Sequence, residues 1–200
     1  DGELFDLAEQ GKLKDPETLS AQVDRMLADP KSKRLTSNFL RVWLELDNIG
    51  KMPPSKEFVS FYRDNLESAM RRETELLFEH VLKKNLPPRE LLAANYSFMN
   101  RELAEHYGMP GLEGKEFRKV SLSGSGNQRG GLLGHGSFLT ASANGVDTSP
   151  VVRGIYVMNK LLDYTPPPPP DDVPEIEPDV TGATTLRDQL VKHRADATCA

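Results

Sequence analysis

One stretch of the chain, residues 56–84, contains neither glycine nor proline and carries apolar side chains at helical spacing. Such a run restricts the fold more than any other feature, because it predicts one long amphipathic helix around which the neighbouring elements must pack. Pro87 and Pro88 end this helix. We expect Phe61 and Leu77 to lie in the core that it organises.

Short helices surround the long one and are marked by caps. Asp15-Pro16-Glu17 is an N-cap with a proline and an acid in the first turn, which predicts a helix ending before Asp29-Pro30. Two more helices are predicted at 89–94 and at 100–108, the latter capped by Asn100 and ended by Gly108. Another is predicted at 32–46, with these side chains facing inward: Leu35, Phe39, Leu40, Val42, Trp43 and Leu46.

After Pro110 the predicted helices give way to a short strand and a glycine-rich segment. Residues 117–122 predict a short strand, and residues 129–140 are rich in glycine but also apolar, which predicts a packed segment. Ser149-Pro150 begins a helix whose Gly154 indicates close packing. Five prolines, 166–170, then impose an extended strap, and a last helix is predicted at about 185–194.

These elements predict a mainly α fold with little or no β structure. A helical bundle at 1–110 precedes a smaller loop-rich helical part at 111–200, which holds the polyproline strap.

Charge and hydropathy exclude several classes of protein. The net charge of −5 and the mixing of basic with acidic residues argue against a nucleic-acid partner. No apolar run approaches the roughly 18 residues that span a bilayer. The chain begins with Asp1-Gly2-Glu3, which includes no initiator methionine and does not have the pattern of a signal peptide. We therefore expect both ends to be cuts from a longer protein.

The acidic residues of the long helix do not form a recognisable metal site. A helical di-iron centre uses Glu-x-x-His pairs, and His80 has Leu77 at the position where glutamate is needed. Zinc signatures are absent too. Glu73, Glu75 and Glu79 therefore predict a solvated helix face with ion pairs, and no metal ligand is assigned.

The glycine-rich segment offers weak candidates for chemistry. It lacks both the phosphate-loop pattern and the Gly-x-Ser-x-Gly elbow of hydrolases. Ser137, His135 and Asp147 could make a triad, but nothing in the sequence fixes their geometry, so no catalytic residue is assigned. His135 is either a hydrogen-bonded structural histidine or a haem ligand.

The sequence allows two interpretations of what Arg129 and Arg153 bind. Arg129 and Arg153 could bind an anion at the start of the Ser149-Pro150 helix. Alternatively, Arg153 could bind the acidic Asp171 or Asp172 of the strap.

An ordered string of motifs resembles domains of unknown function in large exported proteins of planctomycetes and related bacteria. The resemblance covers nearly the whole chain and is carried by Met70-Arg71-Arg72-Glu73-Thr74-Glu75-Leu76, Tyr96-Ser97-Phe98-Met99-Asn100, His106-Tyr107-Gly108, Arg129-Gly130-Gly131-Leu132-Leu133, Ser137-Phe138-Leu139-Thr140 and Thr148-Ser149-Pro150-Val151-Val152-Arg153-Gly154. In that family the last segment runs into a Cys-x-x-Cys-His site for c-type haem.

The resemblance implies a cofactor and a location. Cys199, the only cysteine, stands where the first haem cysteine would be, but the second cysteine and the histidine are missing. This chain alone is therefore expected to hold no cofactor, while its parent would carry haem c, with His135 or His193 as an axial ligand. An exported or periplasmic location follows, with the rest of the parent chain and redox proteins as partners.

The sequence is compatible with three functions. The first is a structural, electron-transfer-associated module. The second is an extracellular enzyme acting on saccharides, with a site around Arg129, His135, Asp147 and Arg153. The third is an interaction module that uses Pro166–Pro170 as a docking ligand. A pocket at His135 would favour the enzyme, whereas a fully packed His135 would favour the structural module.

Overall fold

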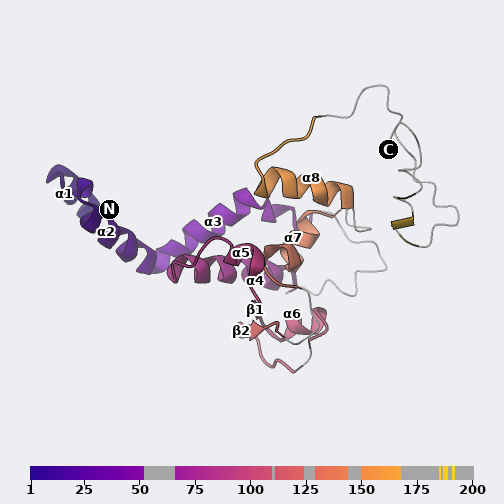
Figure 1. Ribbon diagram of the computed structural model, residues 1–200. Coiled ribbons are helices and arrows are strands. Elements are labelled where there is room, and N and C mark those ends of the chain that lie inside the picture. Colours follow the sequence, from indigo (N-terminus) through magenta and orange to yellow (C-terminus); the bar gives the residue numbers. More distant parts are fainter. Residues whose placement is uncertain are drawn as a thin grey trace. The chain divides into compact units, whose positions relative to one another are not determined.

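A computed structural model describes residues 1–51, 66–109, 111–123, 129–143, 150–167, 185, 187, 188 and 191 of the chain. The chain divides into two compact units, 1–163 and 164–200, and the boundary expected at residue 110 stays a prediction. In the described residues helices dominate and one two-stranded sheet is present (Figure 1), which confirms a mainly α fold. None of the described helices is both long enough and apolar enough to cross a membrane.

The helices and strands follow one another in a simple order. Their bounds are α1 (Gly2–Glu9), η1 (Lys12–Lys14), α2 (Pro16–Ala28), η2 (Pro30–Ser32), α3 (Lys33–Trp43), η3 (Leu46–Asn48), α4 (Leu66–Lys83), α5 (Glu90–Ala93), β1 (Tyr96–Met99), α6 (Arg101–His106), β2 (Arg118–Ser121), η5 (Leu132–Gly134), α7 (Gly136–Ala141) and α8 (Pro150–Leu161), where η denotes a 3₁₀ turn.

The predicted caps are present where the structure describes them. Asp15 accepts a hydrogen bond from the backbone nitrogen of Thr18 at 2.9 Å, and Asn100 accepts one from Leu103 at 3.0 Å. Thr185 and Asp188 exchange reciprocal hydrogen bonds of the kind that begin a helix, where the last helix was predicted. Local chemistry thus determines where these helices start.

Helix α4 is the central element of the first unit, as predicted for the long run without glycine or proline. It contacts α3, α5, α6, α7 and β1. Leu77 has no exposed surface, and Met70 is 4% exposed. The predicted beginning of this helix at 56–65, including Phe61, lies outside the described residues.

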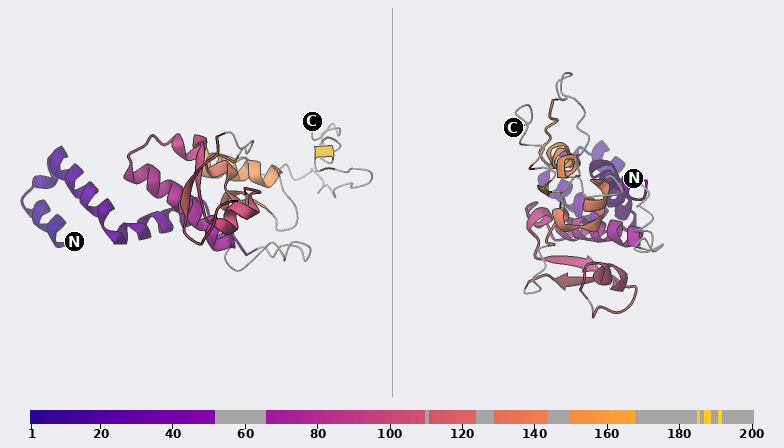
Figure 2. Two further views of the ribbon diagram at one scale, coloured as in Figure 1. Left: turned by 90° about the horizontal axis from the view of Figure 1, so that it is seen from below. Right: turned by 90° about the vertical axis from the view of Figure 1, so that its right-hand side faces the viewer.

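The sheet consists of β1 and β2, paired antiparallel with Tyr96 opposite Ser121 and Met99 opposite Arg118. The strand predicted at 117–122 is confirmed. Its partner β1 was not predicted, because its four residues fall between two helical signals. The right-hand view of Figure 2 shows the two strands with α6 beside them.

Two apolar clusters lie on the sides of α4. The first joins α3, α4, α7 and α8, and the second joins α4, α6 and the sheet. The buried members of the first are Leu40, Leu44, Leu46, Ile49, Leu77, Val81, Ala94, Tyr96, Leu132, Phe138 and Tyr156. Those of the second are Leu66, Ala69, Met70, Met99, Leu103, Ala104, Tyr107 and Leu122.

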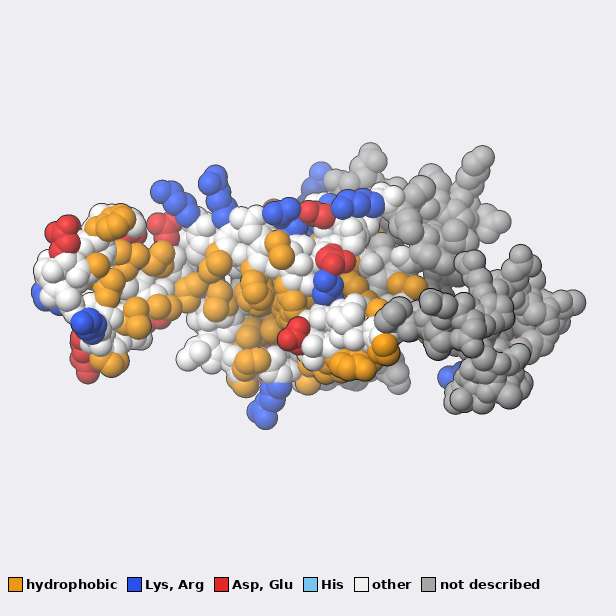
Figure 3. All heavy atoms as spheres, turned by 90° about the horizontal axis from the view of Figure 1, so that it is seen from above, with side chains coloured by type: hydrophobic (Ala, Val, Ile, Leu, Met, Phe, Trp, Pro, Cys, Tyr) orange, Lys and Arg blue, Asp and Glu red, His pale blue; other side chains and the backbone are white. Residues whose placement is uncertain are grey.

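The expectation that one whole apolar side of 32–46 faces inward is wrong for three residues. Leu40 and Leu46 are buried, but Leu35 is 58%, Phe39 45% and Val42 68% exposed. Helix α3 is covered along a narrower stripe than its composition suggests. Figure 3 shows the resulting apolar side chains on the surface along the N-terminal helices.

The glycine-rich segment is packed, as predicted, and its glycines permit close approach to a neighbouring backbone and to buried side chains. A Cβ atom on Gly130 would lie 2.5 Å from the carbonyl oxygen of Ala94. One on Gly136 would lie 2.9 Å from both the Tyr107 hydroxyl and the Met70 methyl carbon. The segment therefore lies directly against α4 and the residues between α5 and β1.

No described residue packs closely against Gly154, whereas the sequence predicts close packing there. A Cβ atom there meets nothing within 4 Å in the part of the chain that the structure describes. Of the proline strap, only Pro166 and Pro167 are described, so its predicted course stays a prediction.

These two glycines give opposite predictions. Gly136→Ala should destabilise the fold by about 1–3 kcal/mol, because its Cβ has no room. Gly154→Ala, the matched control, should stabilise it by about 1 kcal/mol, because alanine favours a helix interior. Urea unfolding followed by circular dichroism measures both. A neutral Gly136→Ala would show that the segment does not lie against α4.

Candidate functional site

A cluster of buried polar side chains lies where α4 meets β1, α6 and the glycine-rich segment. We call it the buried polar network, and its members are Glu73, Thr74, Ser97, Tyr107, His135 and Ser137. Each is at most 7% exposed, and four of them have no exposed surface. Neighbouring residues Glu73 and Thr74 can both be buried because α4 is covered from two sides.

The carboxylate of Glu73 is held by two hydroxyl groups. Ser97 of β1 donates to Oε1 at 2.5 Å, and Tyr107, just after α6, donates to Oε2 at 2.6 Å. The Tyr107 oxygen in turn accepts a hydrogen bond of 2.6 Å from the backbone nitrogen of Gly136. One side chain of α4 thereby connects the sheet, α6 and α7.

The hydroxyl of Thr74 makes the second set of connections. Its oxygen lies 2.9 Å from His135 Nδ1 and 2.6 Å from Ser137 Oγ. The other ring nitrogen, His135 Nε2, lies 3.9 Å from Glu73 Oε1 and has no hydrogen-bond partner among the described residues. The imidazole therefore lies between the two α4 side chains.

Burial shifts the pKa values of the network toward its uncharged forms. It raises the pKa of Glu73 from 4.5 to about 7, against the hydrogen bonds from Ser97 and Tyr107 and the charge of Arg129. It lowers the pKa of His135 from 6.5 to about 3, so this imidazole is neutral at pH 7. Burial and the charge of Glu73 also raise the pKa of Tyr107.

The two arginines of the predicted enzyme site have different partners. Arg129 belongs near the network, with its guanidinium carbon 4.6 Å from the centre of the Tyr107 ring. Arg153 instead donates to Ser142 Oγ at 3.2 Å and to the Leu139 carbonyl at 3.4 Å, at the end of α7. Asp147, Cys199 and the acidic residues proposed to pair with Arg153 lie outside the described residues.

The geometry of His135 is that of a hydrogen-bonded structural histidine, because its side chain has no exposed surface. A haem or a substrate could reach it only if the surrounding elements opened. The role of His135 as a cofactor ligand stays a prediction. Among the described residues, no group of three or more histidine, cysteine, aspartate or glutamate side chains could hold a metal ion.

The sequence predicts that Glu73 lies on the solvated face of α4, and this prediction is wrong. Glu73 is 1% and Glu79 7% exposed, although Glu79 does make ion pairs with Arg72 at 2.8 Å and Lys83 at 3.5 Å. The sequence does contain a signal for the burial of Glu73, because this residue shares the helical spacing of Met70 and Leu77 along the apolar stripe. A charged residue at such a position indicates a buried carboxyl with partners.

The two buried titratable groups give a pH dependence that can be tested. The folded state binds the Glu73 proton more tightly than the unfolded state does, so this group lowers stability as pH rises from about 4.5 to about 7. His135 acts oppositely, raising stability as pH rises from about 3 to about 6.5. The two effects offset each other where the ranges overlap, from about pH 4.5 to about pH 6.5, which leaves a decline in stability from about pH 6.5 to about pH 7.

Glu73→Gln should remove that decline. We expect the stability difference between Glu73→Gln and the native protein to shift in favour of the variant between pH 4.5 and 7, by up to roughly 3 kcal/mol. Urea unfolding at a series of pH values measures it, and groups common to both proteins cancel in the difference. A difference independent of pH would contradict a raised Glu73 pKa.

Two segments of the chain match models of known protein families. Residues 1–109 match the family PSD4, described as protein of unknown function (DUF1592), and residues 129–200 match PSCyt3, described as protein of unknown function (DUF1588). Comparison with curated proteins and with solved structures gives no match. The first match covers more than half of the chain, and the chain therefore belongs to the PSD4 family of proteins of unknown function (DUF1592).

Proposed function

We propose that this chain is a non-catalytic structural module of a larger exported protein that carries c-type haem. One observation carries the structural part of the proposal. The side chains most suited to chemistry, His135, Ser137 and Thr74, have no exposed surface, and their hydroxyl groups are bonded to each other and to the imidazole. They stabilise the fold and have no access to a substrate.

The chemistry of the network also argues against the saccharide-hydrolase alternative. Most glycosidases use two carboxyl groups on either side of the scissile bond. The buried polar network contains one, Glu73, and both of its oxygens accept hydrogen bonds from protein hydroxyl groups. A hydroxyl nucleophile would equally need room for an acyl group beside Thr74 or Ser137, and neither side chain is accessible.

The haem and export parts of the proposal are supported by the family resemblance, with which the matches to the two family models agree. The residues present do not complete a haem site, since Cys199 is the only cysteine and covalent attachment uses Cys-x-x-Cys-His. No step is assigned to haem in this chain. In this proposal the chain supports a haem segment of its parent protein, whose partners are redox proteins outside the cell membrane.

A hydroxyl-directed probe tests the non-catalytic assignment. We expect a fluorophosphonate to leave the native protein unlabelled, because the hydroxyl groups of Thr74 and Ser137 are sealed. Mass spectrometry of the treated protein gives the answer, with an active serine hydrolase treated in parallel as the positive control. Labelling of Thr74 or Ser137 that is lost in Ser137→Ala or Thr74→Val would make the chain an enzyme.

A pyridine haemochrome spectrum tests the haem assignment. We expect a c-type band from the parent protein matured in an oxidising, haem-loading compartment, and no such band from residues 1–200 alone. Cys199→Ala in the parent should remove the thioether that this cysteine forms and shift the band. A well-matured parent without a c-type band would leave only the structural module.

A further inference from the structure

We infer that the PSD4 segment carries a docking surface whose partner is the first part of a PSCyt3 segment, here residues 129–163 of the same chain. The PSD4 segment and this part of the PSCyt3 segment then form one cooperative folding unit. The two family matches stop and start on either side of residues 110–128. The first compact unit, from Asp1 to Asp163, nevertheless includes the whole first match and residues 129–163 of the second. This inference does not depend on the proposed function.

The buried polar network is divided between the two segments. Glu73, Thr74 and Tyr107 come from the PSD4 segment, whereas His135, Gly136 and Ser137 come from the PSCyt3 segment. Three connections cross between them: Tyr107 to Gly136 at 2.6 Å, Thr74 to His135 at 2.9 Å and Thr74 to Ser137 at 2.6 Å. Separation would leave polar groups that now have partners without them.

The larger apolar cluster is also divided between the two segments. Phe138 and Tyr156 meet edge to face at 5.0 Å and pack in one cluster with Leu40, Leu44 and Leu77 of the other segment. All five side chains are at most 8% exposed. Neither segment contains this core by itself, because each supplies one side of it.

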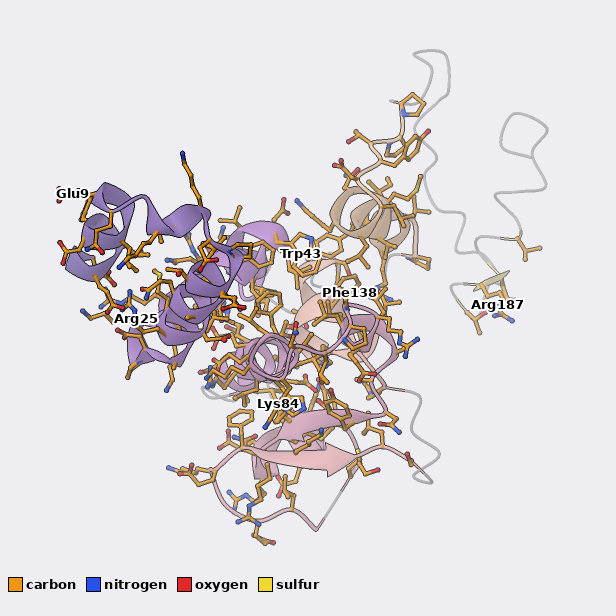
Figure 4. All side chains as sticks on the ribbon, turned by 60° about the vertical axis from the view of Figure 1, so that its left-hand side comes forward. Glu9, Arg25, Trp43, Lys84, Phe138 and Arg187 are labelled. Carbon is orange, nitrogen blue, oxygen red and sulfur yellow. The ribbon has the colours of Figure 1, made fainter. Side chains whose placement is uncertain are left out.

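Polar contacts attach α8 to the end of α3. Trp43 donates its indole N–H to the Lys160 carbonyl at 2.6 Å, and Tyr156 donates to the Leu44 carbonyl. The Lys160 ammonium group lies 2.5 Å from Glu45. Figure 4 shows Trp43 and Phe138 beside α8.

The glycines of the docked segment define the chemistry of the partner. Gly130 and Gly136 leave no room for a side chain against Ala94 and Tyr107. The docking surface therefore accepts a segment with glycine at these two places, an imidazole and a hydroxyl next to the second, and an aromatic side chain two residues after it. This pattern occurs in the chain as Gly130 and His135-Gly136-Ser137-Phe138.

Hydrogen exchange of the full chain in rising urea tests the inference. Amides of α4, in the PSD4 segment, and of α7, in the PSCyt3 segment, should lose protection at the same urea concentration. Phe138→Ala, although located in α7, should accelerate exchange in α4 by about 100-fold or more, since a deleted core aromatic destabilises the whole unit. Phe5→Ala, at a side chain that is 71% exposed, is the control and should leave α4 unchanged.

A milder variant covers the case in which Phe138→Ala does not fold. Tyr156→Phe removes only the hydroxyl that bonds the Leu44 carbonyl, and it should accelerate exchange in α4 and α7 by the same factor, about 5-fold or more. Faster exchange in α7 with unchanged exchange in α4, for either variant, would overturn the inference. So would separate urea transitions of the two helices in the native protein.

Cleavage tests the docking itself. A protease site placed between residues 123 and 129 allows the folded full chain to be cut once. We expect the two pieces to co-elute on size exclusion until urea is added. Two pieces that separate in buffer and each keep their helical circular dichroism would show two independent domains instead.

Discussion

The burial of one carboxyl group on the central helix constrains the rest of the first unit. Glu73 has almost no contact with water, and a carboxyl in that position requires hydrogen-bond donors. Ser97 and Tyr107 supply them, and this fixes both β1 and the end of α6 against α4. Tyr107 extends the constraint to α7 by accepting from Gly136. Three elements, β1, α6 and α7, are thus aligned on a single side chain.

Backbone proximity makes this arrangement feasible. The network closes only because the glycine-rich segment comes near enough for a backbone N–H to reach a tyrosine hydroxyl. Gly130 and Gly136 provide that approach, and the apolar pair Phe138 and Tyr156 then fills the space beside α4. Polar and apolar contacts therefore depend on the same close fit, so a change that widens the gap loses both.

The sequence predicted what depends on neighbours along the chain. The caps at Asp15 and Asn100, the central helix and the strand near 118–121 follow from residues within a few positions. It could not predict β1, the exposure of Leu35 and Val42, or the burial of Glu73, because each depends on which distant element lies opposite. The sequence indicated only part of the site. It singled out His135 in its glycine-rich turn, whereas nothing in the pattern distinguished Thr74 and Tyr107 from ordinary residues of a helix.

The hydroxyl of Tyr107 has a consequence for how this protein can evolve. Its one proton is donated to Glu73 while its oxygen accepts from Gly136, so a single atom serves two partners that lie 63 positions apart. Loss of the hydroxyl leaves both partners unsatisfied, and a smaller side chain at position 107 does not rescue either. Changes at positions 73 and 107 are therefore coupled, and related chains should change these two residues together or keep both, whereas any residue except proline supplies the backbone N–H at position 136.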